Sequence, residues 1–228
     1  MEHKISIKTF NDGILSVDEF KNKKLSNKEV VGIVLQTNVI GLILALPSWE
    51  ECWGSDDFCV DVTEDDYISE AKALTELCGF EATQRIVDAH STYKGMFAAK
   101  RCLEYKCADL QWYLPSLYEL GTIAAFKKEI NDILEEIGLE NAKLKDKWIW
   151  TSSEYSQTYA WCVSFSSGYF FYNSKYYSGV VRAVCAFEPL RGVLSTPSEN
   201  NKELTDSQLI ALLKERGYKG QITKTLTL

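Results

Sequence analysis

The pattern of hydrophobic and polar positions in the first quarter of the chain predicts strands. Residues 4–10 alternate between apolar and polar side chains, which is typical of a short half-buried strand. Two apolar runs, residues 30–35 and 41–46, flank Thr37-Asn38, and this arrangement predicts a hairpin of two buried strands. Pro47 ends the second strand, because proline cannot donate a hydrogen bond to the sheet.

The middle of the chain has helical spacing. Residues 83–90 and 96–105 are predicted to be helices, with Ile86/Val87 and Phe97/Cys102 as inward positions. Ser116-Leu117-Tyr118-Glu119 forms a capping box, in which the serine hydroxyl and the glutamate satisfy each other's backbone N–H groups. The apolar spacing after this box predicts one helix that continues to about Ile137 and stops at Gly138, a favourable residue just past a helix end.

From Trp148 onward the pattern changes to short, aromatic, strand-prone segments at residues 148–150, 160–165, 169–172 and 179–187. Residues 189–202 form a polar linker, followed by a capped helix from Thr205 to Gly217 and an alternating strand at 221–228. We therefore expect three parts. They are an N-terminal strand and polar segment (1–28), a ligand-binding domain (29–188) with a variable region at about 150–187, and a linker with a helix-strand appendage (189–228).

Composition and charge exclude several functions. The formal net charge of −7 and the lack of any Lys/Arg run argue against a nucleic-acid-binding surface. The longest apolar run, residues 30–46, is interrupted by Gln36, Thr37 and Asn38, so we expect no transmembrane segment. The N-terminus has no signal-peptide core. A virion-associated or cell-surface location is nevertheless the expectation, for reasons that follow from the motifs below.

The residues that usually bind metals or catalyse reactions are few. The seven cysteines are an odd number without a Cys-x-x-Cys motif, which predicts mostly reduced thiols rather than a disulfide framework. His3 and His90 are the only histidines, so a zinc site is not expected. The acidic residues between positions 55 and 66 do not have the spacing of a calcium loop and predict a solvated loop. We expect no catalytic residues, no metal and no cofactor.

Residues 162–179 have the composition of a binding surface. Among these eighteen residues are five Ser, four Tyr and three Phe. Tyrosine gives large, rigid, amphipathic contact area, while serine, glycine and asparagine give adaptable hydrogen bonds. Val163 and Phe165 alternate with small polar residues and are predicted to be core. Residues 172–178 have neither strand nor helix periodicity, which favours a long aromatic loop displayed on a scaffold.

Several motifs occur in a fixed order along the chain. They are Trp112-Tyr113-Leu114-Pro115-Ser116, Glu119-Leu120, Trp150-Thr151-Ser152-Ser153-Glu154-Tyr155, Ala160-Trp161 and Val181-Arg182-Ala183-Val184. Over residues 30–187 this set resembles the C-type-lectin-fold domains of phage and gut-bacterial proteins, and more narrowly the variable proteins of diversity-generating retroelements. The resemblance implies an α+β C-type lectin fold with small mixed antiparallel sheets, flanking helices and long loops, to which the C-terminal helix-strand appendage is added.

In that family, adenine-directed mutagenesis of AAC or AAT codons rewrites exposed ligand-binding residues. Such codons reach every residue type between positions 162 and 179 except Lys175. The resemblance therefore implies that the variable, ligand-binding positions are Tyr159, Cys162, Ser164, Ser166, Ser167, Tyr169, Phe171, Tyr172, Asn173, Ser174, Tyr176, Tyr177, Ser178 and Gly179. These should share one exposed face. The fixed scaffold positions, which should be buried, are Trp161, Val163, Phe165, Gly168, Val181, Arg182 and Val184.

The predicted function is ligand recognition or adhesion through this hypervariable surface, without enzymatic activity. No Glu-Pro-Asn, Gln-Pro-Asp or Trp-Asn-Asp triplet occurs in the sequence, so calcium-dependent sugar binding is not implied. The expected partner is a protein or glycan on a cell surface, and a homo-oligomer or larger assembly is compatible with it. Two alternatives remain open: a structural component of a phage tail or surface appendage, and a lectin-like oxidoreductase that uses Cys162 and Cys185.

Overall fold

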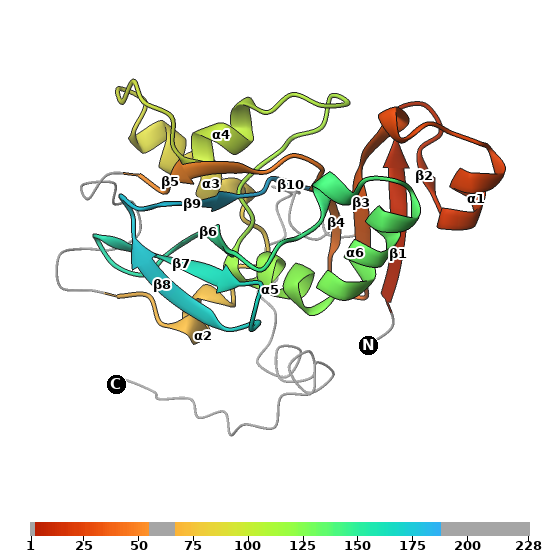
Figure 1. Cartoon of the computed structure of the whole chain (residues 1–228). Helices are drawn as coiled ribbons and strands as arrows, with labels where there is room; N and C mark the ends of the chain where they lie inside the picture. The colour runs from red at the N-terminus through yellow and green to blue at the C-terminus, as the bar shows by residue number, and fades with distance from the viewer. Residues whose placement is uncertain (1–2, 55–66, 188–228) are drawn as a thin grey trace, which may run out of the picture. The chain divides into compact units, whose positions relative to one another are not determined.

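Two five-stranded sheets carry the fold in the computed structural model, which describes residues 3–54 and 67–187 (Figure 1). The first sheet has the strand order β10-β4-β3-β1-β2, formed by β10 (Val184–Ala186), β4 (Gly41–Ala45), β3 (Val30–Thr37), β1 (His3–Thr9) and β2 (Ile14–Leu15). The second has the order β5-β9-β6-β7-β8, formed by β5 (Trp49–Cys52), β9 (Ser178–Val181), β6 (Trp148–Glu154), β7 (Tyr159–Ser164) and β8 (Phe170–Ser174).

The first sheet confirms the strands that were predicted near the N-terminus. β1 corresponds to the alternating segment and pairs antiparallel with β3, with Ile7 opposite Ile33, and both residues are fully buried. β3 and β4 form the predicted antiparallel hairpin. The segment before residue 29 thus contributes a strand to the same sheet as this hairpin.

Of the α-helices in the described residues, one lies between β2 and β3 in the sequence, and the other five lie between β5 and β6. They are α1 (Val17–Asn22), α2 (Glu70–Ala73), α3 (Phe80–Ala89), α4 (Ala98–Glu104), α5 (Leu117–Ala125) and α6 (Lys127–Glu136), with short 3-10 helices η1 (Asn27–Glu29) and η2 (Glu140–Ala142). Helices α3 and α4 confirm the two that were predicted in this part of the chain. Ile86, Phe97 and Cys102 are buried as expected, and Val87 is half-buried.

The prediction of one continuous helix up to Ile137 is wrong. The capping box that starts it is present, with the Ser116 hydroxyl accepting from the Glu119 N–H, but the helix breaks at Phe126 (φ −105°, ψ 15°) into α5 and α6. The buried side chains of both helices keep nearly the spacing of a single helix, so the apolar pattern could not reveal a one-residue break. Gly138 follows α6 at φ +73°, a conformation that glycine adopts without strain.

The second sheet holds the stretch that the sequence marks as a binding surface. β6 pairs antiparallel with β7 and parallel with β9, and β8 lies at the outer edge beside β7. Helix α5 packs against β6 and β7. Successive side chains of β7 point into two different hydrophobic cores on the two faces of the sheet. Trp161 and Val163 lie in the core that contains Leu120 and Ile123 of α5. Cys162 lies in the core on the opposite face.

These elements confirm the α+β class. The predicted acidic loop at residues 55–66 and the predicted appendage at 189–228 lie outside the described residues. Within the described ranges, no helix has the length and apolar character needed to cross a membrane.

Candidate ligand-binding site

The fourteen predicted ligand-binding residues fall into three groups by exposure. The exposed ones are Tyr159, Ser166, Ser167, Tyr169, Tyr172, Tyr176, Tyr177 and Ser178. Ser164, Phe171 and Asn173 are half-buried, and Cys162, Ser174 and Gly179 are buried. Among the five tyrosines of the set, exposure is highest at Tyr169, which precedes β8 and is 77% exposed.

The expectation that all fourteen share one exposed face is wrong. Successive side chains of a strand point to opposite faces, and the pairing Trp161↔Tyr172 and Cys162↔Phe171 places Tyr172 and Phe171 on different sides of the sheet. Cys162 is fully buried, and its thiol donates to the Phe171 carbonyl at 3.3 Å. Burial raises the pKa of the Cys162 thiol, which disfavours the reactive thiolate.

Gly179 is buried for a reason that the sequence does not contain. A Cβ atom placed there would lie 2.0 Å from two ring atoms of Trp148 and 2.8 Å from the indole nitrogen of Trp150. Because Cβ contacts below 3.0 Å do not occur without movement of the neighbour, this position takes glycine alone unless Trp148 moves. Gly179 therefore belongs to the scaffold.

The predicted long aromatic loop at residues 172–178 is also wrong. Its ends belong to β8 and β9, and only Lys175, Tyr176 and Tyr177 connect the two strands. The predicted scaffold positions Trp161, Val163, Phe165, Val181, Arg182 and Val184 are buried as expected. Gly168 is instead exposed at φ +76°, so a turn rather than burial accounts for the glycine there.

Lys175 is fully buried. It is the one residue between positions 162 and 179 whose type cannot arise from an AAC or AAT codon by changes at adenines. Its Nζ lies 2.7 Å from Oε1 of Glu154, donates to the Gln157 carbonyl at 2.9 Å, and is 4.6 Å from the centre of the Trp53 ring. Both side chains of the ion pair are fully inaccessible to solvent. The pair joins the turn that carries Tyr176 and Tyr177 to the central strand β6.

Tyrosines gather at one end of β6, β7 and β8. Tyr155 and Tyr172 stack face to face, with ring centres 3.8 Å apart and an angle of 5° between the planes. Tyr159 meets the edge of Tyr172 at 5.7 Å, and Tyr67 meets Tyr155 at 5.8 Å. Trp161 contacts both stacked rings edge-on from the buried side. We call Tyr67, Tyr155, Tyr159 and Tyr172 the tyrosine surface.

A pocket of about 300 Å³ lies next to the tyrosine surface. Its lining includes Ile68 and Glu154, the chain neighbours of Tyr67 and Tyr155, and the Ile68 N–H donates to the Tyr155 carbonyl at 2.7 Å. The remaining polar lining comes from Lys72, Thr75, Glu76, Arg85 and Ser153. We call this the side pocket. Its volume is at the lower end of the range for small-molecule sites, about 300–1,000 Å³.

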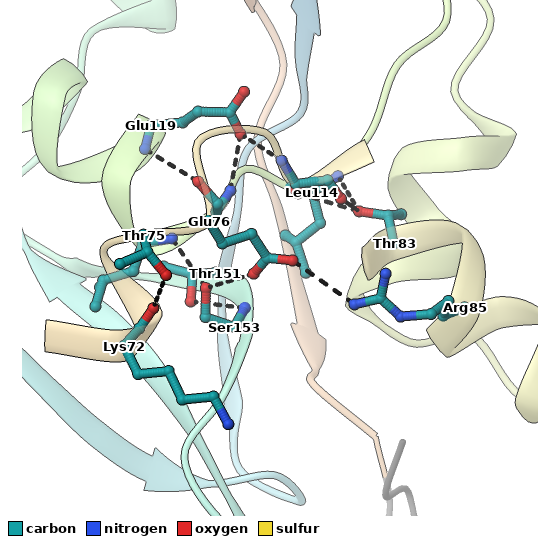
Figure 2. Close-up of polar contacts among 12 residues, drawn as sticks. Lys72, Thr75, Glu76, Thr83, Arg85, Leu114, Glu119, Thr151 and Ser153 are labelled. Carbon is teal, nitrogen blue, oxygen red and sulfur yellow. Dashed lines mark hydrogen bonds and ion pairs between the residues drawn. The ribbon is translucent and has the colours of Figure 1, made fainter. Parts of the chain in front are cut away.

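The polar groups of the side pocket contact one another (Figure 2). The Ser153 hydroxyl donates to Oε2 of Glu76 at 3.3 Å, and Arg85 lies 3.7 Å from Oε1 of the same carboxylate. Both distances are at the long end for such contacts. In Figure 2 the Lys72 side chain extends away from this group. The Glu76 carboxylate therefore lies in the pocket wall, in contact with both Ser153 and Arg85.

Behind the side pocket lies a buried carboxylate that is structural. Glu119 accepts from the Ser116 and Gly79 N–H groups, both at 2.9 Å, and from the Tyr113 hydroxyl at 2.5 Å. Burial raises the pKa of Glu119 to about 7, although these hydrogen bonds act in the opposite direction. The Leu117 N–H donates to the Ser153 hydroxyl, which connects the start of α5 to the pocket wall.

Sequence reasoning missed Tyr67 as a surface residue and all of the side pocket. Tyr67 is 67% exposed and follows the acidic segment, where no periodicity marked it. Glu76 and Arg85 belong to different segments that the fold brings together, and no motif links them. Tyr155 stands out in the sequence only as part of a motif that resembles lectin-like domains.

A second, smaller pocket of about 190 Å³ lies elsewhere and has a basic lining that includes Lys143, Lys145, Lys147 and Arg182. Two of these lysines are already paired, Lys143 with Glu135 and Lys147 with Glu50, both at 2.6 Å. Arg182 donates to the carbonyls of Ala45 and Ala142. Across the part of the chain that the structure describes, no three His, Cys, Asp or Glu side chains are arranged to hold a metal ion.

Comparison with known proteins gives a family and a fold. The family model of the Lcl C-terminal domain matches residues 48–185. The structure is similar to that of a fimbrial protein from Bacteroides ovatus, with a TM-score of 0.59 at 14% sequence identity, covering 80% of this chain and 48% of that one. The chain thus spans about half the length of the fimbrial protein. No curated protein matches the chain.

Proposed function

The chain belongs to the Lcl C-terminal domain family, and from this premise we propose that it is a ligand-recognition protein of a cell or virion surface. The observation that carries the proposal is the tyrosine surface with its adjoining side pocket. Tyr67, Tyr159 and Tyr172 are each more than two-fifths exposed, although burying such rings is normally favourable. Contiguous exposed aromatic side chains beside a pocket are typical of interaction sites.

The scaffold that we propose is lectin-like, with a surface diversified by adenine-directed mutagenesis at fewer positions than the composition suggested. The exposed residues Tyr159, Ser166, Ser167, Tyr169, Tyr172, Tyr176, Tyr177 and Ser178 support it, because their side chains can change without disturbing the core. Cys162, Ser174 and Gly179 are excluded from the set by their burial. The flanking DNA tests this part: it should hold a near-copy of the segment that encodes residues 150–187, with adenines at the exposed positions, beside a reverse transcriptase.

The site supports binding better than catalysis. Burial raises the pKa values of the Cys162, Cys102 and Cys78 thiols, so none of the three is poised as a thiolate. The Glu119 carboxylate is engaged by three donors within the scaffold. A redox role for Cys162 with Cys185 therefore has little support.

An assembly role is the second candidate, because the structural neighbour is described as a fimbrial protein. In that case the exposed tyrosines would make contacts between subunits. Size-exclusion chromatography with light scattering gives the oligomeric state, and chemical iodination shows whether Tyr169, Tyr172, Tyr176 and Tyr177 are accessible. An obligate oligomer in which these tyrosines are protected from iodination supports assembly. Tyrosines that are accessible support ligand display.

Ligand recognition is tested by binding of the labelled full-length chain to intact bacterial and epithelial cells. Tyr172→Ala should reduce binding to a responsive cell type at least tenfold, because it removes the ring at the centre of the tyrosine surface. Phe10→Ala, at an equally exposed aromatic in the turn between β1 and β2, is the matched control and should bind like the unmodified chain. Equal binding by both variants contradicts the proposed site.

A further inference from the structure

We propose that the smaller pocket, with its basic lining, binds a carboxylate carried on a short apolar stem, such as the C-terminal end of a peptide. We call it the basic pocket. Its lining comes from residues 48–50, from residues 143–149 and from Val180 and Arg182. It therefore lies beside β5, at the edge of the second sheet opposite to β8, and it is separate from the tyrosine surface.

Arg182 supplies a free donor to the basic pocket. The residue is only 3% exposed, and its Nε and one terminal nitrogen, Nη2, donate to the carbonyls of Ala45 and Ala142. The other terminal nitrogen, Nη1, has no hydrogen bond with the described part of the chain, yet it is not one of the buried atoms there that lack a partner. It is therefore open to solvent. Because Arg182 lines the pocket, Nη1 is available to an occupant.

The charge of Arg182 lacks a counter-ion. Among the described residues it forms no ion pair with an acidic side chain, and its two hydrogen bonds go to neutral carbonyls. Burial lowers the pKa of Arg182 to about 10, so the guanidinium still carries its charge at neutral pH. A buried charge without an opposite charge is costly, and an anion bound at Nη1 would supply one.

Three lysines line the same pocket, and one of them also has a free charge. Lys143 and Lys147 are each paired with a glutamate at 2.6 Å. Lys145 is exposed and has no ion pair with any described residue. Arg182 and Lys145 are thus two uncompensated cations at one pocket, in a chain whose formal net charge is −7. This local reversal of sign favours an anionic occupant here.

The remaining walls of the basic pocket are apolar and select the kind of anion. Trp49, Leu144, Ile149 and Val180 contribute them. A phosphate or sulfate ion presents oxygen atoms in every direction and would leave these side chains against a hydrated anion. A carboxylate has its two oxygens on one side, where they can meet the two free cations. Its hydrocarbon stem lies on the other side and can be buried against the apolar walls.

The basic pocket has space for the end of a ligand only. Its volume of about 190 Å³ is smaller than the ~300–1,000 Å³ of pockets that hold whole small molecules. A carboxylate with a branched aliphatic stem fits such a space, while the rest of a longer ligand remains outside. Capture of a C-terminal carboxylate is a recurring mode of peptide recognition, and an apolar last residue supplies the stem.

The test is an NMR titration of the isotope-labelled full chain at low ionic strength, in which the backbone amide signals report both the site and the affinity. The probes are N-acetyl-leucine, its uncharged amide, isovalerate, inorganic phosphate and inorganic sulfate. We expect N-acetyl-leucine to shift the signals of residues 48–50 and 143–149, and its amide to leave them in place. Tighter binding of N-acetyl-leucine than of isovalerate supports a peptide end as the source of the carboxylate, and the reverse supports a free organic acid.

Two variants should change the affinity in opposite directions. Lys145→Gln removes a free cation and should weaken the binding of N-acetyl-leucine about fivefold, whereas Glu50→Gln releases Lys147 from its partner and should strengthen it about threefold. The matched controls are Lys94→Gln, at an exposed lysine between α3 and α4, and Asp132→Asn, in another exposed ion pair. Each control makes the same change of net charge elsewhere and should leave the affinity unchanged.

The side-chain N–H signal of Arg182 should shift along the same binding curve. The inference is overturned if this signal stays in place, if neither carboxylate probe binds, or if Lys145→Gln and Glu50→Gln bind N-acetyl-leucine like their controls. Binding of phosphate or sulfate as tight as that of N-acetyl-leucine also overturns it, because the apolar walls would then select nothing. Tyr172→Ala should bind N-acetyl-leucine like the unmodified chain, so the outcome is independent of the tyrosine surface.

Discussion

Two segments of the second sheet differ in composition, and each is located where its composition alone would not place it. Residues 151–154 are Thr, Ser, Ser and Glu, yet all four are buried at the centre of the sheet. Residues 169–177 contain six aromatic side chains, yet Tyr169, Tyr172, Tyr176 and Tyr177 are exposed. Three of the four polar side chains find partners inside the protein: the Thr151 hydroxyl donates to the Trp161 carbonyl at 2.8 Å, the Ser153 hydroxyl accepts from the Leu117 N–H, and Glu154 pairs with Lys175.

The difference shows that position in the sheet, rather than polarity, decides which residues are free to vary. β6 is bordered on both edges and covered on both faces, so its polar groups must find partners within the protein, and among the described residues only the Ser152 hydroxyl and the Trp150 indole N–H of this strand are buried without one. β8 is an edge strand, and the turn after it projects side chains to solvent. Lys175 lies within the exposed segment and Gly179 two residues beyond it, yet both are buried like the residues of the polar segment, and this makes the comparison testable.

The largest expected effect is that of breaking the buried ion pair. Lys175→Met leaves the Glu154 carboxylate buried without its cation, and such losses cost about 3–5 kcal/mol. Urea denaturation should show this decrease in the free energy of unfolding. The same change at Lys128, whose pair with Asp132 is exposed, should shift it by no more than about 0.5 kcal/mol. Equal effects at the two lysines would mean that Lys175 is not part of the scaffold.

The second effect concerns pH and the buried Glu119. Its pKa in the folded state is about 7 and its ordinary value is 4.5, so the folded protein holds the proton more tightly than the unfolded chain does. The stabilisation is complete below pH 4.5 and is lost as the pH rises to 7, by an amount on the order of 3 kcal/mol. Urea denaturation between pH 4.5 and 8 should show this loss. Glu119→Gln keeps the shape of the side chain but cannot ionise, so the free energy of unfolding of this variant should depend little on pH over the same range. If its pH dependence is the same as that of the unmodified chain, the loss comes from other groups.

The sequence predicts those features whose partners lie close together along it. The Ser116–Glu119 capping box and the hairpin of β3 and β4 join residues that are close in the chain, and the burial of Val163 and Phe165 follows from their alternation with small polar neighbours. The parts that could not be predicted depend on distant partners. The pairing of Lys175 with Glu154, the contact of Gly179 with Trp148 and the convergence of Glu76, Arg85 and Ser153 arise only when the second sheet has formed.

The third effect tests whether a nominally variable position can vary. Gly179→Ser introduces a side chain whose Cβ would lie 2.0 Å from the Trp148 ring, and overpacking of this kind costs about 1–3 kcal/mol. Ser178→Asn, one residue earlier and exposed, should change the free energy of unfolding by less than about 0.5 kcal/mol. Thermal and urea denaturation of both variants measure the contrast. If Gly179→Ser is as stable as Ser178→Asn, Trp148 moves freely and the position can be diversified after all.

The smallest effect on stability is expected at the turn tyrosines. Tyr176 and Tyr177 contact each other, with ring centres 4.4 Å apart, and each is about half exposed. The Cys52 thiol donates to the backbone carbonyl of Tyr176, which alanine retains. Tyr176→Ala/Tyr177→Ala should therefore lower the free energy of unfolding by no more than about 1 kcal/mol. A loss of 3 kcal/mol, comparable to that of Lys175→Met, would place both rings in the scaffold and end the distinction between the two segments.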